Sequence, residues 1–532
     1  MRIRFRFCFR VGTNRSGRFR EVLRVSEETD GHAYFTETDY EVFNIFPGMC
    51  PAQIRVVGLL KGIKTPDFEQ EFHFLDLGCG QGFALNAYAA VYPRGHFVGL
   101  DMAEGAIAGA RALARDAGLK NVRFEAATFA DFAARTNQKY DVITLHGIWT
   151  WVGAEVREDA LAILSNHLKP GGVVYISGNS AFGRDQAKPA HAILLAMRRE
   201  KPDEEVLDLM KRFGQVLTDN PMLLGHAHRA ASFIEYLVNG NANFFAHEFL
   251  SSAWSPVAFS DLAADMARAG LTFFGSAHPA SLFPGRFFIE PHRSFVEGFQ
   301  NPLDRETAYD ALMATEFRAD LFVKDPEPLS AEEQRQMLLA TPLIVKNRSR
   351  LQLDKKVTGE VADISATKVF EAVCAQLLYG PCTLGEAASK HNLDNVDTKE
   401  FSDTVLLLLM MGAVTAGIGN VHDPETTARA QRFNQAAFQI HARLSGTTPL
   451  ISPQSRSPVS LSIIDSIAIR AERDGIDPVA TLLNVAGTNK VIVRVDGQAV
   501  EDIAAVTKSY QRTFAVWPLV RRPALVSVGV LA

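Results

Sequence analysis

The sequence predicts an α/β fold built on a parallel sheet, followed by a helical insertion and a C-terminal region that is mostly helical. Strand patterns and helix patterns alternate from Phe72 to Ser177. The strands in this stretch are continuous apolar runs, as expected when helices cover both faces of a sheet. A glycine-rich turn joins the first strand to the first helix. Alternating strands and helices imply βαβ units with right-handed crossovers.

The elements of the sheet follow one another in a regular order. Strands are predicted over 72–77, 96–101, 121–127, 140–147 and 172–178, and helices over 82–92, 103–117 and 155–168. Helical patterns continue over 187–250 and 260–269. Two later strands, over 271–277 and 318–324, are expected to return and complete the sheet. Residues 187–265 would then form a helical insertion above its edge.

The domain organisation follows from changes in composition. We expect a basic, disordered arm over 1–30, a sheet domain over 31–186, an insertion with the returning strands over 187–324, and a C-terminal region over 334–532. Residues 325–333 carry prolines and acids and indicate a linker. Within the C-terminal region, three helices and a short strand over about 367–420 predict a winged-helix-like unit. Helices over 424–444 and 463–483 and a strand over 490–495 should follow.

Composition excludes several classes of protein. The chain has 532 residues, 47% of them hydrophobic and 22% charged, which is ordinary for several globular domains. A net charge of -5 gives no reason to expect nucleic-acid binding. Five scattered cysteines argue against a disulfide framework or a structural zinc site. The longest apolar run, Val405 to Met411, is too short to span a bilayer, so we expect a soluble, cytoplasmic protein without a transmembrane segment.

The segment LDLGCGQG, from Leu75 to Gly82, is the most informative motif. Its glycines allow a tight turn and a close approach of a ligand to the backbone at the start of a helix. A dinucleotide fingerprint would have a glycine where Phe83 stands, and a pyrophosphate needs no acid beside it. Asp76 precedes the first glycine and matches a ligand with a cationic amino group. S-adenosylmethionine (SAM) is such a ligand, and it has no phosphate.

Asp101 is the second acid of this predicted site. It ends the second strand, where a carboxylate can accept hydrogen bonds from ribose hydroxyls. The alternative is structural: Asp76 would cap a turn, and Asp101 would cap the helix that starts near Ala103. After the third strand, Thr128 could contact the adenine through its hydroxyl or its backbone. The predicted cofactor-binding set is Asp76, Gly78, Cys79, Gly80, Gly82, Asp101, Met102, Thr128, Phe129 and His146.

The end of the fourth strand should lie beside the transferred group. Here the chain reads YDVITLHGIWTW, so His146, Trp149 and Trp151 could line the reaction site, or the tryptophans could be core aromatics under the next helix. No residue has a signal strong enough to be identified as a catalytic base. The candidate catalytic residues are His146, Trp149, Asn179 and His247.

Histidines in the insertion do not predict a metal site. His226 and His228 are two positions apart and diverge on a helix. His247-Glu248 lacks the second histidine of an HExxH motif, because Ser251 stands there. A lid role for His247 and Glu248 remains open beside simple helix packing.

These motifs resemble those of the class I SAM-dependent methyltransferases, whose core is a Rossmann-like sheet. The resemblance covers residues 72–177 and rests on LDLGCGQG, VGLD and LKPGG. HGIWTWV, GGVVYISGN, FFAHEFL, LTFFGSA and FRADLFVK are similar to the bacterial methyltransferases that carry a methyltransferase regulatory domain. Some of that group methylate lysines of outer-membrane proteins. This chain departs from the pattern after the fifth strand, where SGNSAFG lacks the family's tyrosine and proline, and at Thr128, where an acid is usual.

The resemblance implies a SAM-dependent methyltransferase that acts on a protein lysine. Two alternatives remain open: a methyltransferase for small molecules, and a non-catalytic SAM-binding regulatory or adaptor protein. An NAD-dependent oxidoreductase is disfavoured by Asp76 and Phe83. The expected partner is a protein substrate, with no nucleic acid, and a homodimer is a further open alternative.

Overall fold

The computed structural model describes residues 43–201, 204–219, 250–283, 290–347, 367–393, 396–419, 423–441, 448–488 and 503–527, with a few single residues and short pieces between them. His226, His228 and Glu248, and the predicted arm over 1–30, lie outside these residues. None of the helices in the described part combines the length and the apolar character needed to cross a membrane.

A seven-stranded sheet forms the centre of the N-terminal half, in the order β3-β2-β1-β4-β5-β7-β6. The strands β1 to β5 are parallel, whereas β7 runs antiparallel to β5 and β6 runs antiparallel to β7. The predicted α/β fold and the two returning strands are confirmed. The strands are β1 (Phe72–Leu77), β2 (Gly95–Asp101), β3 (Val122–Ala126), β4 (Tyr140–His146), β5 (Leu168–Asn179), β6 (Leu271–Ser276) and β7 (Phe317–Lys324).

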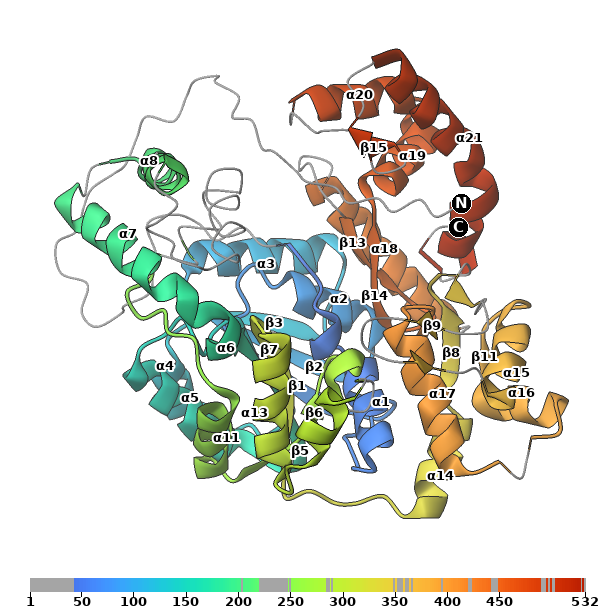
Figure 1. Ribbon diagram of the computed structural model, residues 1–532, viewed down its shortest axis with the longest axis horizontal. Coiled ribbons are helices and arrows are strands. Elements are labelled where there is room, and N and C mark those ends of the chain that lie inside the picture. Colours follow the sequence, from blue (N-terminus) through green and yellow to red (C-terminus); the bar gives the residue numbers. More distant parts are fainter. Residues whose placement is uncertain are drawn as a thin grey trace.

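Helices cover both faces of the sheet, which explains why its strands are apolar throughout (Figure 1). Neighbouring residues of β1 point to opposite faces, and both Phe74 and Leu75 are fully buried. Phe74 packs with α1 (Pro51–Lys61), α2 (Phe83–Val91) and α3 (Glu104–Asp116). Leu75 packs with α4 (Phe129–Arg135), α5 (Ala154–His167) and α11 (Phe259–Arg268). The result is a three-layer sandwich.

The insertion and the regulatory stretch contribute further helices. These are α6 (Ala181–Arg184), α7 (Lys188–Glu200), α8 (Val206–Asp219), α12 (His292–Glu297) and α13 (Pro302–Met313). The predicted helical pattern between 220 and 246 lies outside the described residues.

The C-terminal region begins with a small helical unit. It contains α14 (Ala331–Leu339), β8 (Pro342–Val345), α15 (Lys368–Leu377), β11 (Cys382–Thr383), α16 (Leu384–Lys390), α17 (Thr398–Met410) and β12 (Val414–Ala416). The predicted helices are present, and the small sheet has the order β11-β8-β12. In the described residues β12 pairs with β8 and not with a following strand that would make a wing. The winged-helix interpretation therefore stays a prediction.

The rest of the chain is α18 (Pro424–His441), β13 (Thr448–Ser452), β14 (Ser457–Leu461), α19 (Ile463–Asp474), α20 (Pro478–Thr488) and α21 (Ile503–Ser527). The single helix predicted over 463–483 is wrong. It is two helices, because Gly475 ends α19 in the left-handed region, with φ of 66°, and Pro478 starts α20. Of the strand predicted over 490–495, the structure describes only the short β15 (Arg494–Val495).

The segment predicted as a linker to the C-terminal region is hydrogen-bonded to the sheet domain. The backbone of the predicted linker bonds the turn after α1, from Leu329 N to Gly62 O at 2.8 Å and from Lys64 N to Glu327 O at 2.9 Å. The helix α14 starts at Ala331, inside the predicted linker. One hydrophobic cluster joins residues of α2, such as Leu85, to residues of α18, such as Phe433. The two halves of the chain therefore share a core.

Candidate active site

The glycine turn after β1 presents open space beside its backbone. Gly78, Gly80 and Gly82 all have positive φ, at 76°, 51° and 59°. A Cβ atom on Gly82 would lie 2.4 Å from Phe124 Cε1, so only glycine fits against β3 there. A Cβ atom on Gly80 would meet nothing within 4 Å. A ligand can thus approach the main chain at Gly80, directly before α2.

Asp101 holds this turn in place. Its Oδ2 accepts a hydrogen bond from Gly80 N at 2.8 Å, and its Oδ1 accepts one from Ala103 N at 2.9 Å. The bond from Ala103 N closes a turn directly before α3 and does not cap the helix, because Ala103 is itself the N-cap residue. The bond from Gly80 N ties the end of β2 to the glycine turn. Burial raises the pKa of its carboxyl group, while hydrogen bonds from Ala103 and Gly80 lower it.

Asp76 lies beneath the same turn. Its side chain is 4% exposed, and Oδ1 accepts a hydrogen bond from Thr144 Oγ1 at 2.7 Å. Burial and the nearby charge of Asp101 raise the pKa of Asp76 to about 7, although the bond from Thr144 opposes this shift. Neither carboxylate forms an ion pair with a residue that the structure describes. Among the described residues, this edge of the sheet therefore carries acids without a counter-cation, which suits a cationic ligand.

The remaining predicted cofactor residues lie around the ends of β1, β2 and β3. Met102 follows Asp101 and is 46% exposed, so its apolar surface is available to a flat ring. The Cys79 side chain is half-buried beside Gly99. The Thr128 hydroxyl accepts from Asp131 N at 3.1 Å and donates to Asp131 Oδ2 at 2.8 Å. Because that hydroxyl caps α4, the adenine contact predicted for it would fall to the backbone of Thr128 and Phe129.

His146 ends β4 inside a network that sequence patterns did not reveal. Its Nδ1 lies 3.0 Å from the Tyr175 hydroxyl and 2.9 Å from Ser177 Oγ, both on β5. The Phe46 ring stacks on the imidazole with 3.5 Å between centroids. Burial, with a smaller contribution from His278, lowers the pKa of His146 to about 3. The imidazole is therefore neutral at physiological pH.

The segment before α1 covers this edge of the sheet. The Phe46 carbonyl accepts a hydrogen bond from the Tyr88 hydroxyl at 2.6 Å. Phe43 packs edge-on against Phe83, the first residue of α2, with 5.9 Å between the ring centroids. The aromatic residues before Pro47 are the feature of the sequence that could have indicated this cover. Nothing in their spacing relates them to β4.

The other candidate residues near the ends of β4 and β5 lie in two places: the tryptophans in the hydrophobic core, and Asn179 at the end of its strand. Trp149 is 1% exposed and packs with Leu145 and Leu164 beneath α5, so the alternative of a core aromatic describes it better than a lining role. Trp151 is buried as well. Asn179 ends β5, opposite Phe317 of β7. Its Nδ2 is buried and has no hydrogen-bond partner in the described part of the chain.

His247 is buried, and Glu248 beside it lies outside the described residues. The described residues hold no cluster of histidine, cysteine, aspartate and glutamate that could bind a metal ion.

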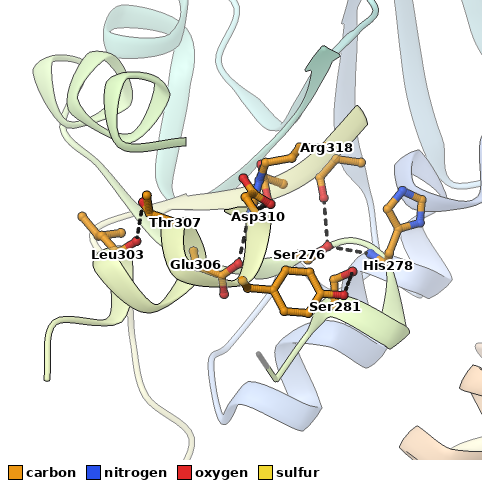
Figure 2. A network of polar contacts seen from close by, with 11 residues as sticks. Ser276, His278, Ser281, Leu303, Glu306, Thr307, Asp310 and Arg318 are labelled. Atoms are coloured by element: carbon orange, nitrogen blue, oxygen red, sulfur yellow. Dashed lines mark hydrogen bonds and ion pairs between the residues drawn. The ribbon is translucent and has the colours of Figure 1, made fainter. Parts of the chain in front are cut away.

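A network of buried charges joins β7 to α13 (Figure 2). Arg318 of β7 is bidentate to Asp320, at 2.8 and 2.7 Å. It also donates to Asp310 Oδ1 at 2.8 Å and to Glu306 Oε2 at 3.0 Å, both on α13. Burial raises the pKa of Glu306 to about 7, although the Arg318 charge opposes the shift. Since Arg318 pairs with Gly178 of β5, this network fixes α13 against the strand that carries Asn179.

Two family models match the chain. The family described as "Methyltransferase domain" matches residues 68–216, and the family described as "Predicted methyltransferase regulatory domain" matches residues 241–324. The first covers the glycine turn, both acids and β4. The second covers β6, α13 and β7, so the Arg318 network belongs to the regulatory domain.

The chain is also similar to whole proteins. An uncharacterized protein from Synechocystis is 27% identical over 524 residues, which cover 94% of this chain and 100% of the relative. A malonyl-[acyl-carrier protein] O-methyltransferase from Bacillus cereus is 27% identical over 26% of this chain and 48% of its own length. The structure of PKMT2 from Rickettsia typhi, solved in complex with AdoHcy, has a TM-score of 0.61 at 18% identity and covers 90% of this chain and 97% of that chain.

At this identity the likeness to PKMT2 establishes a shared fold, and the family models identify the domains that the fold carries. The chain therefore carries a SAM-dependent methyltransferase domain with a Rossmann-like sheet, followed by a methyltransferase regulatory domain.

Proposed function

We propose that this methyltransferase acts on the side-chain amine of a protein lysine, with SAM held between the glycine turn and the two acids. One observation carries the proposal: the carboxyl edge of the sheet has two chemically different parts. Asp76 and Asp101 supply negative charge without a described counter-cation. Beside them, at the ends of β4 and β5, the side chains are neutral or aromatic.

The cofactor side fits SAM by its donor set. Asp76 would accept the cationic amino group, and the backbone beside Gly80 leaves space for the amino-acid portion. Each Asp101 oxygen accepts one bond in this structure and retains a lone pair, so it can also accept a ribose hydroxyl. Met102 would cover the adenine. When bound, SAM supplies a methyl group on a cationic sulfur, and the protein's task is to align and desolvate the nucleophile.

The acceptor side suits an amine that has already lost its proton. An ammonium group has no free electron pair, and apolar surroundings lower the pKa of a lysine. The Phe46 and Phe317 rings contribute such surroundings next to His146. The His146 ring is neutral and has Nδ1 engaged, which leaves Nε2 to bond the amine. The Asn179 amide oxygen would accept an N–H of the same amine and direct its lone pair.

A carboxylate acceptor fits this edge less well. The similarity to an O-methyltransferase raises that possibility for the catalytic domain. A carboxylate would require a cation or several donors at the acceptor end. Arg318, behind this edge, already contacts Glu306, Asp310 and Asp320. Arg184, which follows β5, pairs with Glu316. A small-molecule amine remains a competing acceptor for the experiment to decide.

The test uses the purified full chain with isotope-labelled SAM and a bacterial lysate, followed by mass spectrometry of the labelled products. We expect the label on lysine side chains of protein, in bonds that survive mild alkali. Label confined to small molecules, or label released by alkali as expected of a methyl ester, would overturn the proposal. Asp101→Ala, which weakens the proposed cofactor site, serves as the control with reduced labelling, and Glu104→Ala, at an exposed acid at the start of α3, as the control with full labelling.

A further inference from the structure

The helix α18 belongs to the C-terminal region, yet it lies against the helix that follows the glycine turn. Its residues share a hydrophobic cluster with α2 and α3, and Figure 1 shows α18 running beside the sheet domain near α2. The helix α2 has only 9 residues, all of them buried. A helix this short is marginal by itself, so tertiary contacts decide where it lies.

Arg429 of α18 binds the end of α2. Its Nη2 donates to Ala89 O at 2.7 Å, and its Nε donates to Ala90 O at 3.2 Å. Both carbonyls lie in the last turn of α2, where no intrahelical donor is left for them. Nη2 also donates to Asn121 Oδ1 at 2.7 Å, and Asn121 Nδ2 donates to Ala89 O at 3.2 Å. A guanidinium also suits the negative end of the α2 dipole.

Phe433, one turn further along α18, contacts the opposite end of α2. Its ring lies 5.5 Å from that of Phe83, the residue that directly follows Gly82. Phe83 is 2% exposed and also meets Phe43 on its other side. The aromatic side chain that breaks the dinucleotide fingerprint is therefore the point where the C-terminal region touches the glycine turn.

We propose that Arg429 and Phe433 are positioning residues for the cofactor. They hold both ends of α2 from the C-terminal region and thereby set the glycine turn against Asp101. This inference rests on the cofactor site proposed above. It predicts that the C-terminal region controls SAM affinity without contacting SAM, so that any partner that displaces α18 would weaken cofactor binding.

The test is calorimetric titration of SAM into the full-length wild type, Arg429→Ala, Arg429→Lys and Phe433→Leu, with unfolding temperatures recorded alongside. Losing the hydrogen bonds of Arg429 should raise the SAM dissociation constant about 10-fold in Arg429→Ala. Arg429→Lys, which keeps a donor and the charge, should recover part of the affinity. The Michaelis constant for SAM should rise while that for the acceptor stays unchanged.

Arg432→Ala is the matched control, because Arg432 is an exposed arginine on the same helix that approaches Gly118 of the α3–β3 turn. It should bind SAM like the wild type. Unchanged SAM affinity in Arg429→Ala and Phe433→Leu would overturn the inference. If Arg429→Ala cannot be purified, unchanged affinity in Arg429→Lys and Phe433→Leu would have the same meaning. A wild type that binds no SAM would instead contradict the proposed cofactor site.

Discussion

The cofactor end and the acceptor end of this site are assembled in different ways. At the cofactor end, Asp76, Gly80 and Asp101 come from one strand–turn–helix–strand stretch, and backbone N–H groups hold the carboxylate of Asp101. At the acceptor end, Phe46, His146, Tyr175, Asn179 and Phe317 come from separate segments. The first end is charged and local in sequence. The second is neutral and depends on how distant parts of the chain pack, so the two ends should fail in different ways.

The largest effect should come from the network that supports the acceptor end. Arg318→Met removes the guanidinium and leaves Glu306, Asp310 and Asp320 buried without it. Breaking a buried ion pair in this way costs about 3–5 kcal/mol of stability. Urea unfolding, followed by tryptophan fluorescence, would measure the loss. Arg268→Met, which removes an exposed pair with Glu158, should cost less than about 1 kcal/mol.

The pH dependence of that loss gives a further check. Glu306 has a pKa of about 7 in the folded chain, above its ordinary value of 4.5, so its neutral form is favoured by folding. The corresponding stability is present at low pH and decreases as the pH rises through about 7. Without the guanidinium, the carboxylates repel one another more strongly. The loss of stability in Arg318→Met, relative to the wild type, should therefore be larger at pH 8 than at pH 6. Equal losses at the two pH values would contradict this account.

Removing a single carboxylate from the cofactor end should weaken SAM binding while leaving the fold intact. Asp101→Ala removes the acceptor for Gly80 N and for a ribose hydroxyl. Charge-assisted hydrogen bonds contribute about 1.5–3 kcal/mol each, so SAM affinity should fall at least about 10-fold. Calorimetry would show this change, with the acceptor Michaelis constant unaltered. Micromolar binding that survives the substitution would remove Asp101 from the cofactor site.

Asp76 should make SAM binding depend on pH. Its pKa of about 7 means that it is largely protonated at pH 6, and a neutral carboxyl group binds a cationic amino group poorly. Binding the cation favours the ionised form, so affinity should rise as the pH increases through about 7. Well below that pKa the dissociation constant should change about 10-fold per pH unit. Asp76→Asn should bind weakly with no such slope, whereas a slope kept in that variant would assign the titration to another group.

The difference between contacts that are local in sequence and contacts between distant segments also decides what could be predicted from the sequence. The strands, the return of β6 and β7 and the glycine turn follow from local patterns, because each is encoded in a few consecutive residues. Asp101 is visible in the sequence as a polar residue at the end of β2, but its bond from Gly80 N depends on the conformation of the turn and could not be predicted. Phe46 over His146 and Arg429 on α2 could not be predicted, because each contact joins segments far apart in the chain.

Trp149 illustrates an alternative that the sequence leaves open. The aromatic pair after β4 could line the reaction site or belong to the core, because apolar residues of a site and of a core look alike in a sequence. The structure places Trp149 with leucines under α5, while the less distinctive Tyr175 and Ser177 reach His146. A polar residue inside a buried strand was the better signal, because such a group requires a partner.

The smallest expected effect concerns His146 and would sharpen the boundary between the two ends. His146→Ala removes a neutral hydrogen-bonding group from the acceptor end. Such a bond contributes about 1 kcal/mol, so kcat should fall roughly 5- to 10-fold. SAM affinity should stay unchanged, because Asp76 is hydrogen-bonded to Thr144 and Asp101 to Gly80 and Ala103, and not to this ring. The pKa of about 3 also predicts that titration of His146 does not limit the rate of the wild type between pH 6 and 8. His96→Ala, an exposed histidine at the start of β2, provides the control for loss of an imidazole. A fall in SAM affinity with normal kcat would move His146 to the cofactor end and leave Asn179 as the group that faces the acceptor.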